Sequence, residues 1–395
     1  MIALRDVFIN KEISKINSEI ETELNDKVRK IKLKYDISFL LDYLAIGTVA
    51  DVVSLDENNR LIVETGLNRI KSGKANVGIK ALCNVKDIDE KKITTSDIGF
   101  KIGPVLNAAG RLKNMSLGID LLLSDSIVEA NAKAIELNNV NIERKAMQKE
   151  MREKVIEDYE NEEKKELEKL DFDKEKFDFS KVFYNPTFHE GIIGILASNI
   201  KDMFYLPAIV FSDTEDVHLI KGSGRSINEI HLRDAIDYVF KKDPSIISKF
   251  GGHSMAAGLS IYKDKLNDFQ RLFDESCKLI LNGEKPVDVK LIDMNLNLNN
   301  IDIETVELIN SQIWGQNFKP PLFIGQFSII DQKILKGQHL KLQLKQKDSN
   351  YTIDAMYFFK KEMIEKTDDY IDVSYTLNIN TFLNKKTIQL FVDSI

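Results

Sequence analysis

The chain has 395 residues, of which 55 are lysine or arginine and 62 are aspartate or glutamate, so its formal net charge is −7. Hydrophobic residues make up 43% and charged residues 30%, as in a soluble globular protein, and the length indicates two to three domains. The acidic balance argues mildly against a protein that coats nucleic acid through bulk electrostatics, and the sequence has no apolar run of about 18 residues that would predict a membrane span.

The N-terminal sequence and the cysteines indicate the compartment. The chain starts with MIALRDVFINKEISKIN, which lacks the basic, apolar and small-residue order of a signal peptide. Cys83 and Cys277 lie in apolar helical contexts, without the spacing of a metal site. Free buried thiols are typical of a reducing compartment. We therefore expect a cytoplasmic protein that does not contact membranes.

The first predicted elements lead to an acidic residue. Residues 1–38 have a helical pattern, because isoleucine and leucine recur at helical spacing among glutamate and lysine. Residues 39–55 form a nearly continuous apolar run, typical of a buried helix or strand, and Asp51 lies within it. A buried carboxylate is costly unless it is paired or binds a metal ion. Asp51 is therefore interpreted as a helix cap, a partner in a distant ion pair, or a metal ligand.

Two segments follow before the sequence becomes rich in strands. Gly103–Leu112 reads GPVLNAAGRL, in which the Gly-Pro pair predicts a turn and Asn107–Arg111 a compact polar element. Residues 117–170 form one long helical pattern that ends in a dense run of glutamate and lysine. Such a run is typical of a solvated helix face, and the apolar repeat is too short to favour a coiled coil. We predict a helical spacer.

An α/β domain is predicted from Lys181 onward. Short strand patterns alternate with helical patterns over Gly191–Phe204 and Leu232–Phe240, which indicates a mixed sheet, and an amphipathic helix follows. His189 and Glu190 stand just before the first of these helices. They are interpreted as a catalytic pair or, with greater weight, as a capping turn.

Two glycine-containing motifs of this domain predict anion binding. Lys221–Ser226 reads KGSGRS, and its two hydroxyls and one arginine suit a terminal phosphate. Lys249–Gly258 reads KFGGHSMAAG, where a helix starting after the glycines would offer N–H groups to an anion and His253 would donate to a phosphate. A tight strand–helix junction with a buried histidine is the alternative for the second motif alone. Two such motifs in one domain favour phosphate as the ligand.

The last part of the chain predicts a small β-barrel. About six strand patterns follow Pro286, most of them alternating in character. Lysines and aromatic residues near one another in this part suit single-stranded nucleic acid, although each aromatic residue is equally well explained as barrel core. These residues are Lys341, Lys345, Lys347, Tyr351, Tyr357 and Phe358.

The two motifs, together with LDYLAIGTVADVVSL (Leu41–Leu55), GPVLNAAGRL and FHEGIIGILASNI (Phe188–Ile200), resemble the RecJ family of DHH phosphoesterases, which are single-strand-specific 5′→3′ DNA exonucleases. The resemblance runs in order from about Leu40 to the C-terminus. Trp314–Pro321 departs from it, because it reads WGQNFKPP where the family has a turn rich in glycine and proline. The implied α/β multidomain fold comprises part of a DHH-type α/β domain (1–116), a long connecting helix (117–175), a mixed-sheet α/β substrate-binding domain (176–284) and an OB-like β-barrel (285–395).

The resemblance also implies roles for single residues. Asp51 would bind a divalent metal ion, and with His253 it would take part in catalysis. Asn107, Arg111 and His189 would line the substrate cleft. Residues implied to hold DNA phosphates, beginning with the 5′-terminal one, are Ser223, Arg225, Ser226, Gly251 and Gly252, with His253 beside them.

The family's metal site is incomplete in this sequence. Hydrolysis by two metal ions, which the resemblance implies to be Mn²⁺ or Mg²⁺, needs several converging carboxylates and histidines. The family supplies most of them through a DxD-type strand end and the DHH triplet. Neither occurs here, and the five histidines include no adjacent pair. We therefore expect a truncated exonuclease that is inactive alone.

The predicted function is metal-dependent hydrolysis of single-stranded DNA in DNA repair and recombination. The resemblance implies single-stranded DNA with a 5′ end, a single-strand-binding protein and a helicase as partners. A non-catalytic binder of single-stranded nucleic acid is one alternative, because metal ligands are missing. A nanoRNase or cyclic-dinucleotide phosphodiesterase is another, since those share GGHxxAAG, but they lack the long helix and the barrel.

Overall fold

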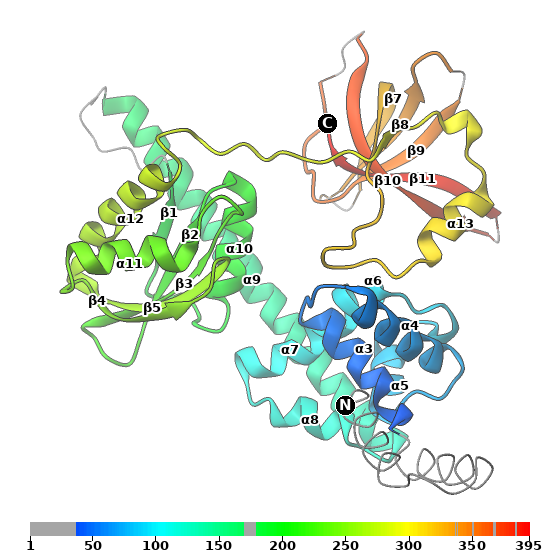
Figure 1. Ribbon diagram of the computed structural model, residues 1–395, viewed down its shortest axis with the longest axis horizontal. Coiled ribbons are helices and arrows are strands. Elements are labelled where there is room, and N and C mark those ends of the chain that lie inside the picture. Colours follow the sequence, from blue (N-terminus) through cyan, green and yellow to red (C-terminus); the bar gives the residue numbers. More distant parts are fainter. Residues whose placement is uncertain are drawn as a thin grey trace, which may run out of the picture. The chain divides into compact units, whose positions relative to one another are not determined.

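The computed structural model describes residues 37–169 and 179–395, except positions 336, 338, 350, 366–368 and 384 and the side chains of 162–169. The described residues form two compact units (Figure 1). One comprises residues 37–104, 122–131 and 290–395, and the other residues 105–121 and 132–289. The helix predicted over residues 1–38 lies almost entirely outside the described residues.

Helices form the first part of the chain, and strands dominate the last (Figure 1). The helical elements are η1 (Ser38–Leu40), α3 (Leu41–Ala50), α4 (Glu57–Lys71), α5 (Val77–Val85), η2 (Glu90–Lys92), α6 (Thr95–Asp97), the π-helix η3 (Ile98–Ile102), α7 (Gly103–Leu112), α8 (Ser116–Leu122), α9 (Ile127–Lys169), α10 (Ile193–Phe204), α11 (Leu232–Lys242), η4 (Lys263–Lys265), α12 (Leu266–Ile280), η5 (Leu298–Asn300) and α13 (Ile303–Ser311). The strands are β1 (Lys181–Tyr184), β2 (Ala208–Asp213), β3 (Leu219–Arg225), β4 (Ile247–Gly252), β5 (Ala256–Tyr262), β6 (Met294–Asn295), β7 (Phe323–Leu335), β8 (His339–Gln346), β9 (Thr352–Tyr357), β10 (Ile371–Phe382) and β11 (Lys385–Ser394).

The apolar run over residues 39–55 is helical up to Ala50, and it buries Asp42 rather than Asp51. Asp42 is fully buried on α3 and accepts hydrogen bonds from the backbone and side-chain nitrogens of Asn76, at 2.7 and 2.6 Å. Arg69 lies 3.7 Å from the same carboxylate. These partners offset the cost of removing the charge from water. The buried carboxylate of Asp42 therefore has its hydrogen-bond and charge partners within the first unit and needs no metal ion.

Two helical segments differ from expectation. Gly103–Leu112 was predicted to begin with a turn, but it is helical throughout, because Pro104 occupies the first helical turn, where a missing N–H costs nothing. The continuous helix predicted over 117–170 is interrupted between α8 and α9. Ser126 precedes α9 at the position where a short polar side chain favours a helix start.

The second unit is built on a five-stranded sheet in the order β1-β2-β3-β5-β4. Only β1 and β2 run parallel, so the predicted mixed sheet is confirmed. Apolar residues of α11 and α12 form a core with one face of the sheet. Residues of α10 and α9 pack on the other face, against β2.

The motif KFGGHSMAAG folds differently from the prediction. Its glycines end strand β4, and a short turn leads into β5, so no helix starts after them and the predicted helix N-terminus is wrong. His253 N donates to Ala256 O at 2.8 Å and closes the turn. The imidazole is exposed rather than buried. Strand β4 was not predicted, because its glycines interrupt the alternation of side chains that identifies a strand in a sequence.

Strands β7 to β11 form the predicted barrel. β7 pairs with β8, β8 with β9, β9 with β11, β11 with β10, and β10 returns to β7, which closes the ring. Short β6 adds to β7 in parallel. Phe327 and Tyr375 are among the largest side chains of its core. The OB-like fold class is confirmed.

Two further expectations concern cysteines and membranes. Cys83 and Cys277 are free and buried, as predicted. Burial raises the pKa of the Cys83 thiol to about 12 and raises that of Cys277 as well. In the part of the chain that the structure describes, no helix has both the length and the apolar character needed to cross a membrane.

Candidate functional site

The glycines of the motif KGSGRS face the packed core of the second unit. Successive residues of β3 point to opposite faces of the sheet. A Cβ on Gly222 would lie 2.5 Å from the Phe211 ring, and one on Gly224 would lie 2.9 Å from Leu232. These two glycines therefore allow close packing of the sheet against its core.

Ser223 and Arg225 face the other side of β3, where α10 begins. Arg225 Nη1 donates to Ser223 Oγ at 3.3 Å and to the Gly224 carbonyl oxygen at 2.7 Å. A Cβ on Gly194, in the first turn of α10, would lie 2.9 Å from Ser223 Oγ and 3.1 Å from Arg225 Nη2. A hydroxyl, a guanidinium and a helix N-terminus are thus adjacent.

The N-terminus of α10 offers an unpaired donor. Among the described residues, the Gly194 N–H has no hydrogen-bond acceptor, as is usual in the first turn of a helix. Such N–H groups and the helix dipole favour a negative charge at this end. With Ser223 and Arg225 beside it, this end has the donors that an anion requires.

Arg111 of α7 also reaches the loop before α10. Its Nη1 donates to the Gly191 carbonyl oxygen at 3.2 Å. A Cβ on Gly191 would lie 2.1 Å from the Arg111 carbonyl oxygen, so only glycine permits this contact. Asn107, one turn earlier on α7, is exposed on the same side of the helix. Sequence reasoning had named both residues as cleft residues.

A third guanidinium, which the sequence analysis missed, belongs to Arg144 of α9. Arg144 is 8% exposed, and it donates to Asn141 Oδ1 at 3.2 Å and to Gln148 Oε1 at 3.4 Å. Gln148 in turn donates to Asn199 of α10 at 3.0 Å. Neutral amides therefore hold this arginine. The available signal was the spacing Asn-Arg-Gln at i, i+3 and i+7, which puts three polar side chains on one helix face.

Arg111, Arg144 and Arg225 form what we call the arginine cluster. Burial lowers the pKa of Arg111. The pKa values of Arg144 and Arg225 are also lowered, mainly by burial and to a smaller extent by the positive charge of Arg111. Arginine nevertheless remains cationic at neutral pH. Within the described residues, none of the three forms an ion pair with a carboxylate. Partly buried like charges without a counter-ion are unfavourable, so the cluster favours a bound anion.

On the sheet face that carries Ser223, glycines occupy the neighbouring positions of β5 and β4. Ser223 pairs with Gly258 on β5, and Gly258 pairs with Gly251 on β4, so that the three residues form one row across the sheet. A Cβ on Gly251 or Gly258 would have no atom within 4 Å. We call Gly258 and Gly251 the glycine row. A ligand can approach the backbone here without meeting a side chain.

The turn after the glycine row carries the predicted catalytic histidine. Gly252 has a φ of 153°, and a Cβ there would lie 2.4 Å from the Ala256 carbonyl oxygen, so this position requires glycine. His253 follows with its side chain exposed. The geometry leaves the imidazole accessible to a ligand on the row.

Two other predicted residues have partners within the fold. Ser226 is 1% exposed, and its hydroxyl donates to the backbone carbonyl four residues on, at 2.8 Å. His189 Nδ1 accepts from the Gly191 N–H at 3.0 Å, the geometry of a capping turn. Glu190 pairs with Lys221 at 2.8 Å, and this hydrogen bond lowers the pKa of Glu190. Ser226 therefore adds no free donor to the cluster, whereas His189, whose Nδ1 is the acceptor, carries its proton on Nε2.

Asp51 lies in the first unit, exposed at the C-terminus of α3. Val52 after it has a φ of 55°, a left-handed conformation that costs a β-branched residue about 1–3 kcal/mol. Strain of this kind is concentrated at functional positions. Among the described residues, no three histidine, cysteine, aspartate or glutamate side chains are grouped as a metal site. Asp51 is thus at most one ligand of such a site.

Comparisons with known proteins agree with this organisation. The DHHA1 domain model matches residues 179–279, and the RecJ OB domain model matches residues 292–394. The single-stranded-DNA-specific exonuclease RecJ of Haemophilus influenzae is 39% identical over 363 residues, which are 90% of this chain and 61% of that protein. The single-stranded-DNA-specific exonuclease RecJ of Escherichia coli is 38% identical. The matched region covers 91% of this chain and 61% of that protein.

Solved structures show the same fold. The crystal structure of RecJ in complex with Mg²⁺ from Thermus thermophilus superposes with a TM-score of 0.73 at 21% identity, over 93% of this chain and 54% of that one. The chain thus spans about three fifths of the length of the curated relatives named above. Both family models and the curated relatives point the same way, and the chain belongs to the RecJ family.

Proposed function

We propose that the chain grips the 5′-phosphorylated end of single-stranded DNA and is the substrate-holding part of a single-strand-specific exonuclease. The observation that carries this proposal is the arginine cluster, which has three partly buried cations and no carboxylate partner among the described residues. The activity named for the relatives supports the choice of DNA as the anion. The proposed role of each residue follows from its chemistry.

The terminal phosphate belongs beside Ser223, Arg225 and the first turn of α10. A terminal phosphate carries about −1.5 to −2 charges at neutral pH, whereas an internal phosphodiester carries one. Three guanidinium groups therefore bind the terminal phosphate more strongly than an internal one. The glycine row then accepts the following phosphates against the backbone, and His253 donates a hydrogen bond to one of them.

Hydrolysis requires more than the described residues supply. A divalent metal ion, Mg²⁺ or Mn²⁺, would stabilise the charge that develops on the phosphate. Asp51 is the proposed ligand from this chain, but no cluster of metal-ligating side chains accompanies it among the described residues. This observation favours a second, narrower function for the 395-residue chain by itself, namely binding of single-stranded DNA without cleavage.

The experiment that tests the grip compares two labelled single strands that differ only at the 5′ end. Fluorescence anisotropy is expected to give at least 10-fold tighter binding of the 5′-phosphorylated strand than of the 5′-hydroxyl strand, because charge-assisted hydrogen bonds contribute about 1.5–3 kcal/mol. Arg225→Met removes this preference, whereas Arg233→Met, on the exposed side of α11, keeps it. Equal affinity of the wild-type chain for both strands would refute the proposed grip.

A second assay separates binding from cleavage. The wild-type chain is incubated with the 5′-phosphorylated strand and Mn²⁺, and released nucleotides are measured. Binding without release is the expected result. Release by this chain alone would show that a complete metal site exists, contrary to the proposal.

The wider biological setting follows from the same proposal. The proposed setting of the chain is DNA repair and recombination in the cytoplasm. There a helicase would expose the single strands, and a single-strand-binding protein would cover them. Purified single-strand-binding protein should bind the chain in the absence of DNA in a sedimentation assay. Separate sedimentation of the two proteins would remove this partner from the proposal.

A further inference from the structure

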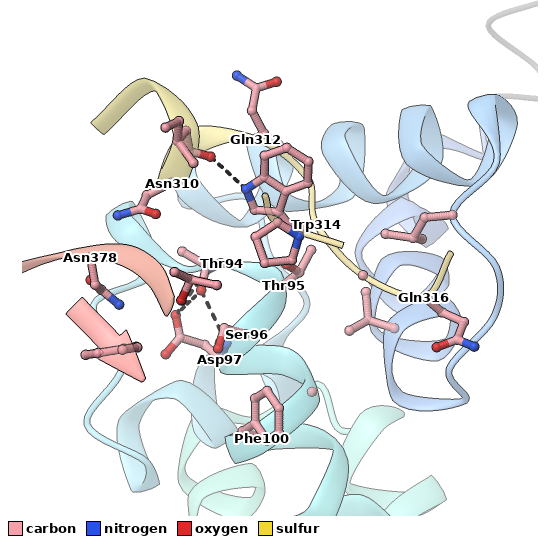
Figure 2. Close-up of a pocket in the computed structure, with 18 of the residues that line it drawn as sticks. Thr94, Thr95, Ser96, Asp97, Phe100, Asn310, Gln312, Trp314, Gln316 and Asn378 are labelled. Carbon is pink, nitrogen blue, oxygen red and sulfur yellow. Dashed lines mark hydrogen bonds between the residues drawn. The ribbon is translucent and has the colours of Figure 1, made fainter. Parts of the chain in front are cut away.

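The first unit contains a cavity of about 910 Å³ where its helical part meets the segment before the barrel. Leu55 N donates to the Gln316 carbonyl oxygen at 2.8 Å, which joins the two parts. Figure 2 shows Trp314 and Phe100 on either side of the Thr94–Asp97 turn, with all three lining the cavity. Trp314 begins WGQNFKPP, the segment that departs from the family pattern.

The cavity is electrically neutral. Asp97 and Lys101 are the charged residues of its lining, and they pair with each other at 2.7 Å. Asp97 also accepts from the Thr94 backbone and hydroxyl, at 3.0 and 2.9 Å. The lining therefore has no spare cation for a phosphate and no spare carboxylate for a basic peptide. Its occupant is expected to be uncharged.

The cavity exposes aromatic and apolar surface. Phe100 is 78% exposed and Val52 64% exposed, although both are large hydrophobic residues. Trp314 stacks on Phe318, with ring centroids 5.0 Å apart and planes 20° apart, and the Arg60 guanidinium lies 3.7 Å from the Phe318 ring centroid. Trp314 lines the cavity, whereas Phe318 and Arg60 do not. Trp314 therefore belongs both to the stack and to the cavity lining, which places an aromatic ring at the cavity.

Amide side chains lie around this aromatic surface (Figure 2). In the described part of the chain, Asn310 has no side-chain hydrogen bond, and Asn378 uses only its oxygen, which accepts from Ile379 N at 2.7 Å. Gln312 uses only its nitrogen, which donates to Leu308 O at 3.2 Å and to Ser311 Oγ. Donors and acceptors thus remain available. A planar, neutral group with polar edges matches them.

We infer that this cavity is a nucleobase-binding site, in which a base of single-stranded DNA stacks on Trp314 and bonds to the amides of Asn310, Gln312 or Asn378. The inference rests on the proposed function, because it takes single-stranded DNA as the ligand, but it concerns bases and not phosphates. Stacking of one base on an aromatic side chain is worth about 1–3 kcal/mol by alanine substitution, a 5- to 150-fold effect on affinity.

The test uses the fact that Trp314 is the only tryptophan of the chain. A 5′-phosphorylated oligothymidylate of about 12 nucleotides is titrated into the wild-type chain. Tryptophan fluorescence is recorded, together with the anisotropy of a copy that keeps the 5′-phosphate and carries its label at the 3′ end. The expected result is quenching that saturates with the same affinity as the anisotropy. An abasic strand of the same length and charge should bind without quenching.

Two exposed phenylalanines provide a matched pair of variants. Phe100→Ala is expected to weaken binding of the thymidylate about 5-fold and to leave binding of the abasic strand unchanged. Phe359, which is 75% exposed and does not line the cavity, serves as the control. Trp314→Phe keeps a stacking surface and should bind better than Trp314→Ala at equal thermal stability.

The outcomes separate the two proposals. Normal anisotropy without quenching, together with an unaffected Phe100→Ala variant, overturns the nucleobase site and leaves an apolar protein segment as the occupant. Equal quenching by the abasic strand overturns it as well. Absence of any binding in the anisotropy titration refutes the proposed function itself, and quenching by free thymidine would then still support the base site.

Discussion

The α/β domain and the barrel carry positive charge in different ways. In the α/β domain and its flanking helices, Arg111, Arg144 and Arg225 lie together without a carboxylate partner among the described residues. In the barrel and the segment before it, several lysines are paired with acids: Lys341 with Asp354 at 2.7 Å, Lys290 with Asp393 at 2.5 Å, and Lys386 with Glu307. Lys345 and Lys347 have no carboxylate partner among the described residues, but they are exposed or half-exposed strand-end lysines and not a buried cluster.

This difference separates two contributions to DNA binding. An exposed ion pair adds little stability, about 0–1 kcal/mol, but it removes a cation from those available to a phosphate. The arginine cluster is thus the expected main source of electrostatic affinity, and the barrel side of the chain contributes aromatic surface and fewer available cations. A chain with a net charge of −7 can bind a polyanion only if its cations are segregated in this way.

The largest expected effect concerns the packed side of the α/β sheet. Gly222→Val places a branched side chain where a Cβ alone would be 2.5 Å from the Phe211 ring and 2.9 Å from Leu259. Overpacking of this kind costs about 3 kcal/mol or more. Urea denaturation should show the loss. Gly258→Val on the opposite face is the control and should unfold at the wild-type midpoint, and equal losses in both variants would contradict the assignment of the two faces.

Arg144→Met tests the electrostatic half of the comparison. Loss of one cluster cation should weaken binding of 5′-phosphorylated DNA about 10-fold and make the dependence on salt concentration less steep. The free energy of unfolding should rise by about 1 kcal/mol, because a buried like charge is removed. A purely structural role predicts lower stability with the salt dependence unchanged. Arg152→Met, exposed on the same helix, should change neither quantity.

Gly258→Val also sharpens the account of the glycine row. The new side chain stands where DNA backbone is proposed to lie, so affinity for single-stranded DNA should fall about 5-fold, while the protein remains as stable as the wild type. Anisotropy titration and thermal denaturation on one preparation give both values. Unchanged affinity would place the DNA elsewhere on the sheet.

Lys341→Met probes the barrel and should have the smallest effect. Because Asp354 already neutralises Lys341, removal of the lysine is expected to change DNA affinity less than 2-fold at about 0.15 M salt. The double variant with Asp354→Asn should behave likewise. A loss comparable with that of Arg144→Met would show that the barrel ion pairs open when DNA binds, and the contrast drawn above would fail.

The sequence predicted the sheet, the barrel and the β3 motif because each has a local pattern. Ser223 and Arg225 were identified because both stand in one short motif with suitable chemistry. Arg144 was missed because it joins them only through packing of α9 against α10, which no local pattern records. The expectation that Asp51 is buried was wrong, and the burial of Asp42 was not predicted, for a related reason. Which of two acids in an apolar run is buried depends on the helix face that α4 covers, and this is set by tertiary contacts.

The two kinds of glycine on the sheet imply two kinds of selection on the gene. At Gly222 and Gly224, any larger residue collides with side chains of the packed core, so variants are removed whenever the protein must fold. At Gly251 and Gly258 a side chain has space, and variants persist until the protein must hold its ligand. A library of variants sorted first for folded protein and then for ligand capture would therefore lose the first group in the first round and the second group only in the second.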